Sequence, residues 1–140
     1  MLNKGLELNV GNNRSILVVD DENDILSVIQ RWLLMHGFKL CAFTDIFAAL
    51  DHFNSNSEDH DIVISDIRMP GMNGYEFVKQ VKKINPQVKI ILMSAFEIKD
   101  NELSNFLPNL KVDAFIKKPF SLMSLNKIVQ EQYKQVTKLI

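Results

Sequence analysis

Cysteine, net charge and long apolar runs are all scarce in this sequence of 140 residues. The one cysteine, Cys41, cannot form a disulfide within the chain, and reduced thiols are typical of the cytoplasm. A formal net charge of -1 gives no general attraction to nucleic acid or to an anionic membrane. No apolar run approaches membrane-spanning length, and the polar first residues do not form a signal peptide. We therefore expect a cytoplasmic protein that binds neither nucleic acid nor membrane directly.

Hydrophobic residues make up 46% of the sequence, which is enough for one domain with a proper core. Residues 1–14 are rich in Asn and Gly and show little periodicity, so we expect a flexible N-terminal tail there and a domain over residues 15–140.

Short apolar runs alternate with segments of helical spacing along the whole domain. The predicted strands are 15–19, 38–43, 61–66, 88–93 and 112–116, and the predicted helices lie within 25–37, 44–53, 73–85, 103–107 and 121–136. Residues 54–60 read as a polar loop, and Cys41 reads as a small buried side chain within a strand. Five such alternations imply a doubly wound parallel sheet with helices on both faces, and the helices are too few for a barrel.

Chemically active side chains follow four of the five predicted strands. Asp20 and Asp21 follow the first, Asp66 ends the third, and Ser94 and Lys118 come after the fourth and the fifth. In a parallel sheet these ends meet at one edge, where two carboxylates about 4 Å apart would repel by roughly 4 kcal/mol at an effective dielectric near 20. A cation should therefore sit among them, and all-oxygen ligands suit Mg²⁺. A carboxylate, Mg²⁺, a lysine and a hydroxyl together suit phosphoryl transfer, with the carboxylate itself as a possible acceptor.

Each of these residues also has a purely structural interpretation. Asp20 and Asp21 could place negative charge at the start of the first helix, Asp66 could cap a loop, and Lys118 could be a solvated strand end. Their coincidence at successive strand ends favours a functional site.

Taken together, these motifs resemble the receiver domain of two-component response regulators, of the chemotaxis-regulator-like kind. The resemblance runs from about Ser15 to the last helix, and it is carried by Asp20-Asp21, Asp66 with Met69-Pro70 and Asn73-Gly74, Ser94-Ala95 and Lys118-Pro119-Phe120. It implies a flavodoxin-like strand order of 2-1-3-4-5.

The resemblance also implies a role for each site residue. Asp66 is the phosphoryl acceptor, Ser94 and Lys118 contact the phosphoryl group, and Mg²⁺ is bound by Asp20, Asp21, Asp66 and the backbone carbonyl of Arg68. Ser94 and Phe115 form the switch, by packing alone because phenylalanine has no hydroxyl. The donor is a phosphohistidine on a sensor histidine kinase or a phosphotransfer protein. The output is contact with a downstream protein, and the chain is not an enzyme acting on other molecules.

Alternative classes fit less well. One alternative is a haloacid-dehalogenase-like phosphatase, which is Mg²⁺-dependent and uses an aspartate nucleophile. Such an enzyme has this aspartate on its first strand and a second aspartate two residues later. In this sequence Arg68 occupies the position two residues after Asp66. A flavodoxin would lack the acidic run that begins at Asp20, and a pseudo-receiver would have lost a site residue. Whether the chain is a stand-alone regulator or the receiver portion of a longer one stays open.

Two adjacent lysines, Lys117 and Lys118, end the fifth predicted strand. Neighbours on a strand point to opposite sides, so only one of them can reach the site. The family pattern places the active lysine before proline, hence Lys118, and Lys118-Pro119 is a candidate for a cis peptide bond.

Overall fold

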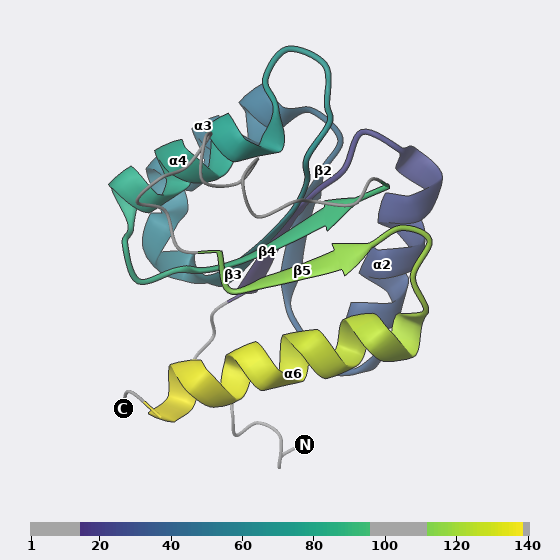
Figure 1. Ribbon diagram of the computed structural model, residues 1–140. Coiled ribbons are helices and arrows are strands. Elements are labelled where there is room, and N and C mark those ends of the chain that lie inside the picture. The colour runs from purple at the N-terminus through teal and green to yellow at the C-terminus, as the bar shows by residue number, and fades with distance from the viewer. Residues whose placement is uncertain (1–14, 96–111, 139–140) are drawn as a thin grey trace.

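The computed structural model describes residues 15–95 and 112–138 and contains one five-stranded parallel sheet in the order β2-β1-β3-β4-β5 (Figure 1). The strands are β1 (Ser15–Val19), β2 (Leu40–Phe43), β3 (His60–Asp66), β4 (Lys89–Ser94) and β5 (Ala114–Lys117). The helices are α2 (Asn23–Met35), α3 (Ile46–Asn56), α4 (Gly74–Ile84) and α6 (Leu122–Lys138), with a short 3₁₀ helix, η1 (Ser57–Asp59), before β3. The doubly wound fold and its strand order are as predicted.

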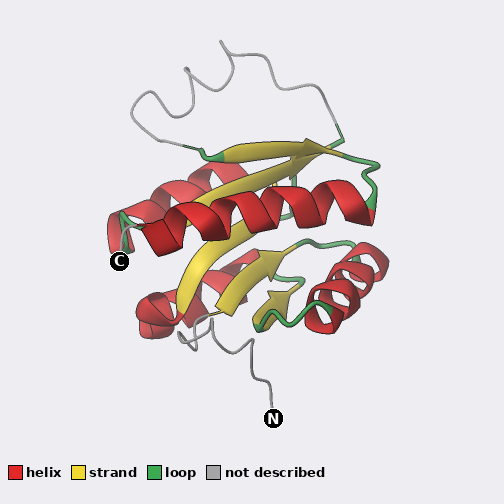
Figure 2. Cartoon of the chain, turned by 90° about the horizontal axis from the view of Figure 1, so that it is seen from below, coloured by secondary structure: helices red, strands yellow, loops and turns green. Residues whose placement is uncertain are grey.

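Helices cover both faces of the sheet, so its central strands are apolar on both sides. In β1, Leu17 and Val19 pack with residues of α3 and α4, whereas Ile16 and Val18 pack with residues of α2 and α6. Figure 1 shows these two helix pairs on opposite sides of the sheet. The strands run in one direction, and their arrowheads lie on the same side of the molecule (Figure 2). This alignment brings the carboxyl ends of the strands to one edge.

The helix ends follow the local sequence signals. Asp45 accepts a hydrogen bond from the backbone N–H of Phe47 at the start of α3, and Asn73 does the same for Glu76 in α4. Gly37 has a φ of 88° just beyond α2, a conformation that favours glycine. These signals fix the points where the chain turns back towards the sheet.

The predicted boundaries differ from the structure around His60. The sequence pattern placed this residue in a polar loop, but it is 1% exposed and begins β3. Its ring lies 6.0 Å from the ring of Phe53, and its Nδ1 is 2.8 Å from the Oγ of Ser15, so the histidine is buried with a polar partner. α3 also runs further than predicted, to Asn56.

Smaller differences affect the outer strands. β2 begins at Leu40 rather than residue 38, and β5 spans Ala114–Lys117 rather than 112–116. Cys41, predicted to be buried, is only partly buried because β2 lies at the edge of the sheet. The predicted tail at 1–14 and the predicted helix at 103–107 lie outside the described residues. Within the described parts of the chain, no helix has both the length and the hydropathy to span a membrane.

Candidate phosphoryl-acceptor site

The carboxyl edge of the sheet forms a pocket of about 230 Å³. Its walls are Asp21, Glu22, Asp66, Arg68, Ser94, Ala95 and Lys118. Strand pairing produces this convergence, since Asp66 aligns with Met93 of β4 and Ser94 aligns with Lys117 of β5. The predicted site residues Asp21, Asp66, Ser94 and Lys118 therefore line one cavity.

Lys118 is the centre of the charge network. It is 8% exposed, and its Nζ lies 2.7 Å from Asp20 Oδ2, 3.1 Å from Glu22 Oε1 and 3.4 Å from Asp66 Oδ2. Its backbone N–H donates to the Ser94 carbonyl at 2.7 Å, and the bond to Pro119 is cis. Lys117, by contrast, is exposed. Of the two adjacent lysines, Lys118 therefore lies among the carboxylates.

Glu22 is a partner of Lys118 that the sequence analysis did not assign. It belongs to the same acidic run as Asp20, and its backbone N–H donates to Asp20 Oδ1 at 2.9 Å. The sequence did contain a signal for this contact, because Glu22 directly follows Asp20 and Asp21, the two carboxylates expected to bind the metal.

Asp66 lines the pocket with its carboxylate partly desolvated. Its Oδ1 accepts a hydrogen bond from the backbone N–H of Ile67 at 3.0 Å, and the residue is 7% exposed. Burial raises the pKa of Asp66 to about 6, and the neighbouring charge of Asp20 adds to this rise, whereas the charge of Lys118 opposes it. Ionisation of Asp66 is therefore energetically unfavourable in this site, and an added cation would stabilise the ionised carboxylate.

The pKa of Lys118 moves in the direction that keeps it charged. Burial by itself lowers this pKa, but hydrogen bonds to Asp20 and Glu22, with the charges of Asp20 and Asp66, outweigh burial and raise it. These carboxylate partners therefore favour the charged form of Lys118.

The carboxylates also provide the ligand set expected for Mg²⁺. Single oxygens of Asp20, Asp21 and Asp66 lie within 4.8 Å of one another, and Asp21 is exposed and faces the pocket. Asp20 is fully buried beneath them and is bonded to Lys118. These hard oxygen donors fit Mg²⁺, which commonly takes one or two carboxylates and keeps several waters.

The start of α4 packs directly on the backbone at the end of β3. The backbone N–H of Gly74 donates to the Ile67 carbonyl at 2.6 Å, and a Cβ at Gly74 would overlap the Asp66 carbonyl oxygen. A glycine at this position therefore lets α4 approach closely enough to hold the loop after Asp66.

The predicted switch residues lie on neighbouring strands. Phe115 aligns with Leu92 in β4, two positions before Ser94, and its side chain is 38% exposed. Ser94 is buried and lines the pocket. The Ser94 hydroxyl at the site and the partly exposed ring of Phe115 thus lie on neighbouring strands, offset by two residues along the strand direction.

Comparison with known proteins identifies the class to which this fold and site belong. The family model of the response regulator receiver domain matches residues 16–130. The chain therefore belongs to the family of response regulator receiver domains.

Individual relatives agree with this assignment. The response regulator SaeR of Staphylococcus aureus (strain USA300) is 33% identical over 106 residues, which are 76% of this chain and 44% of SaeR. A CheY-like receiver domain protein of Methanospirillum hungatei has 28% identity and a TM-score of 0.76, covering 89% of this chain and 98% of its own. The regulator TrrA of Thermotoga maritima, solved in complex with Mg(2+)-BeF, has 31% identity and a TM-score of 0.73, covering 85% of this chain and 98% of its own. None of these matches supports the phosphatase alternative, and the chain spans less than half the length of SaeR.

Proposed function

We propose that the chain accepts a phosphoryl group on the carboxylate of Asp66. The observation that carries this proposal is the position of Lys118, whose buried ammonium group lies 3.4 Å from Asp66 Oδ2 and lines the same pocket. A cation at that distance can contact the oxygens of a phosphoryl group attached to Asp66.

The reaction moves a phosphoryl group from a phosphohistidine to an aspartate. A carboxylate oxygen of Asp66 attacks phosphorus, the P–N bond of the donor breaks, and the histidine nitrogen keeps the electron pair of that bond. Lys118 stabilises the negative charge on the equatorial oxygens, and the Ser94 hydroxyl donates a hydrogen bond to one of them. The donor is a sensor histidine kinase or a phosphotransfer protein.

Asp20, Asp21, Asp66 and the backbone carbonyl of Arg68 are the proposed ligands of Mg²⁺. When bound, the ion supplies positive charge that offsets the carboxylates and the incoming phosphoryl group. Support comes from the clustered oxygens of the three aspartates and from TrrA, which was solved with Mg(2+)-BeF.

The proposed output is a change in protein contacts. Movement of Ser94 towards the phosphoryl group would open space beside β4 that Phe115 can fill, which alters the surface around β5. In this proposal the domain spans residues 15–140 and follows a flexible tail. It acts in the cytoplasm and contacts neither nucleic acid nor membrane directly. The only reactions that it catalyses are its own phosphorylation and dephosphorylation. A receiver portion of a longer regulator is the second possibility, supported by the 44% coverage of SaeR.

Intact-mass spectrometry tests the acceptor. With Mg²⁺ and a small acyl phosphate, the wild-type chain should gain one phosphoryl group and Asp66→Asn should gain none. Asp51→Asn, which alters an exposed carboxylate on α3, is the matched control and should be labelled like the wild type. Equal labelling of wild type and Asp66→Asn would refute the assignment.

Amide chemical shifts test the switch. Adding a beryllium fluoride mimic with Mg²⁺ should move the resonances around Ser94 and Phe115 as well as those next to Asp66. Shifts confined to the immediate neighbours of Asp66 would contradict the proposed link through Phe115.

A further inference from the structure

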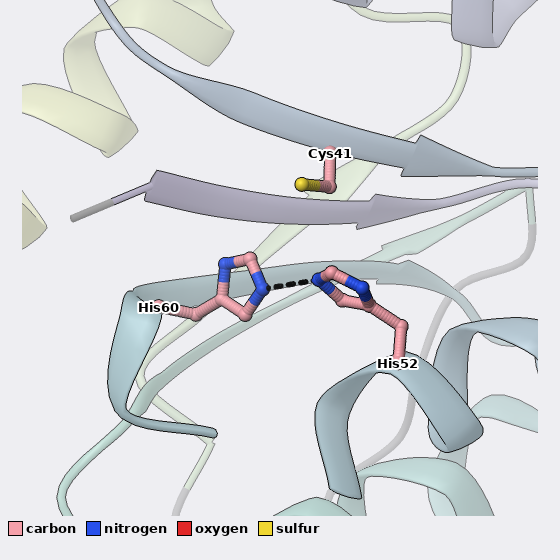
Figure 3. A group of neighbouring side chains, drawn as sticks. All are labelled: Cys41, His52 and His60. Atoms are coloured by element: carbon pink, nitrogen blue, oxygen red, sulfur yellow. Dashed lines mark hydrogen bonds between the residues drawn. The ribbon is translucent and has the colours of Figure 1, made fainter. Parts of the chain in front are cut away.

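A second cluster of potential metal ligands lies far from the phosphoryl-acceptor site. Cys41 of β2, His52 of α3 and His60 of β3 each offer one ligand atom, and these atoms all lie within 4.8 Å of one another (Figure 3). His60 begins β3 and Asp66 ends it, so the two sites are roughly 20 Å apart at about 3.3 Å per residue. We refer to these three residues as the Cys-His-His cluster.

The two imidazole rings of the cluster face each other through the nitrogens that metals use. His52 Nε2 lies 2.9 Å from His60 Nε2, and Figure 3 shows this contact as a dashed line between the rings. One proton between the two nitrogens holds them together in the metal-free chain. When a metal ion takes the place of this proton, the proton moves to Nδ1 of its own ring, so both rings stay neutral and both Nε2 lone pairs face the ion.

The surroundings of His60 orient it as a ligand. Its other ring nitrogen, Nδ1, lies 2.8 Å from Ser15 Oγ, and that hydroxyl lies 3.4 Å from the Asp59 carbonyl, to which it can donate. Ser15 Oγ can then accept the proton of Nδ1, which leaves Nε2 as the nitrogen with the free lone pair. A hydrogen bond of this kind, on the nitrogen away from the metal, is usual for histidine ligands.

Burial keeps His60 in the neutral form that binds metals. Loss of hydration on burial, followed by the charge of His52, lowers the pKa of His60, although Ser15 and the nearby carboxylates of Asp59 and Asp61 oppose this shift. Cys41 and His52 are both only partly buried, whereas His60 is buried.

We propose that the Cys-His-His cluster is a binding site for a zinc-class transition-metal ion. Thiolate sulfur and imidazole nitrogen are both ligand types that Zn²⁺ takes, and a site with three protein ligands commonly has water in the fourth position. This inference is independent of the proposed phosphoryl transfer, because it uses none of the same residues.

The distances fit such an ion after small side-chain movements. With Zn–N near 2.0–2.1 Å, Zn–S near 2.3 Å and tetrahedral angles, ligand atoms lie about 3.3–3.6 Å apart. The two Nε2 atoms would therefore separate by about 0.4 Å from their 2.9 Å contact, and Cys41 Sγ would close by no more than roughly 1.5 Å from the 4.8 Å limit. Changes of this size need only side-chain rotation in one cysteine and one helix-borne histidine.

A titration of the full chain with Co²⁺ and then Zn²⁺ tests the site. Saturating Mg²⁺ is present throughout to occupy the carboxylates around Asp66. The wild type should bind one equivalent of Co²⁺, with a thiolate-to-cobalt charge-transfer band that a carboxylate site cannot produce, and Zn²⁺ should displace it. Cys41→Ser should lose the band, and His52→Gln should bind at least tenfold more weakly. His36→Gln, which changes the exposed histidine that follows the last residue of α2, should bind like the wild type.

A second measurement uses the wild-type chain alone, so that the test does not depend on the folding of any variant. One equivalent of Zn²⁺ should slow alkylation of Cys41 at least tenfold in the presence of Mg²⁺. If Zn²⁺ leaves the alkylation rate unchanged, or if Co²⁺ gives no charge-transfer band, the cluster is only a hydrogen-bonded histidine pair beside a thiol and the proposal is wrong. Binding by His52→Gln with wild-type affinity would also overturn it.

Discussion

Replacing the proposed acceptor with its uncharged analogue should stabilise the metal-free fold. In Asp66→Asn the carboxylate becomes an amide of nearly the same shape, which resembles the protonated form of Asp66. The wild-type side chain is 10% exposed and lies near the buried charge of Asp20, so its ionisation is costly when no metal is bound. The substitution removes this cost.

The size and the pH dependence of the effect follow from the pKa of Asp66. Burial raises it from an ordinary 3.8 to about 6, and each pH unit corresponds to about 1.36 kcal/mol, so ionisation destabilises the fold by about 3 kcal/mol. The pKa of Asp66 is higher in the folded chain than in the unfolded chain. Its favourable contribution to the free energy of unfolding is therefore fully present below pH 3.8 and is lost as the pH rises through about 6. Asp66→Asn should therefore match the wild type near pH 4 and exceed it by about 3 kcal/mol above pH 6.

Urea denaturation between pH 4 and pH 8, with a chelator present, measures this difference. Asp51→Asn is the control, and its free energy of unfolding should follow the wild type at every pH. Addition of Mg²⁺ should narrow the gap between Asp66→Asn and wild type, because the ion stabilises the ionised carboxylate. A pH-independent difference, or an Asp66→Asn variant less stable than wild type above pH 6, would refute the reasoning.

Three further predictions concern the same site. Mg²⁺ at a hundred times its dissociation constant should stabilise the wild-type fold by about 2.7 kcal/mol and so raise its melting temperature. Thermal scans of Asp21→Ala should show little of this rise. Lys118→Ala should lose the chemical-shift changes that follow phosphorylation, whereas Lys117→Ala should keep them; the reverse result would contradict the ion pairs of Lys118. Gly74→Ala should destabilise the fold by about 1–3 kcal/mol in urea titrations, because its Cβ would overlap the Asp66 backbone, whereas Lys79→Ala on the exposed side of α4 should change stability little.

Strand position and residue type were enough to locate Asp66, Ser94 and Lys118 in the sequence, and the resemblance to the receiver family then implied a role for each of them. Parallel strands deliver their carboxyl ends to one edge, so an aspartate after one apolar run and a lysine after another must approach each other. The choice between Lys117 and Lys118 followed from the proline that comes next. Contacts that depend on how far a side chain extends cannot be predicted from strand position. Glu22 was therefore missed as a partner of Lys118.

The sequence by itself determined the order of strands and helices, the doubly wound fold and the edge where the acidic residues gather, because these depend on apolar periodicity and chain direction. Only the tertiary structure decided that His60 is buried, that it faces His52, and that Cys41 lies beside them. These three residues are separated along the chain by a helix and a turn and share no local motif. Their proximity depends on how α3 packs across β1, β2 and β3, which periodicity along one chain cannot specify.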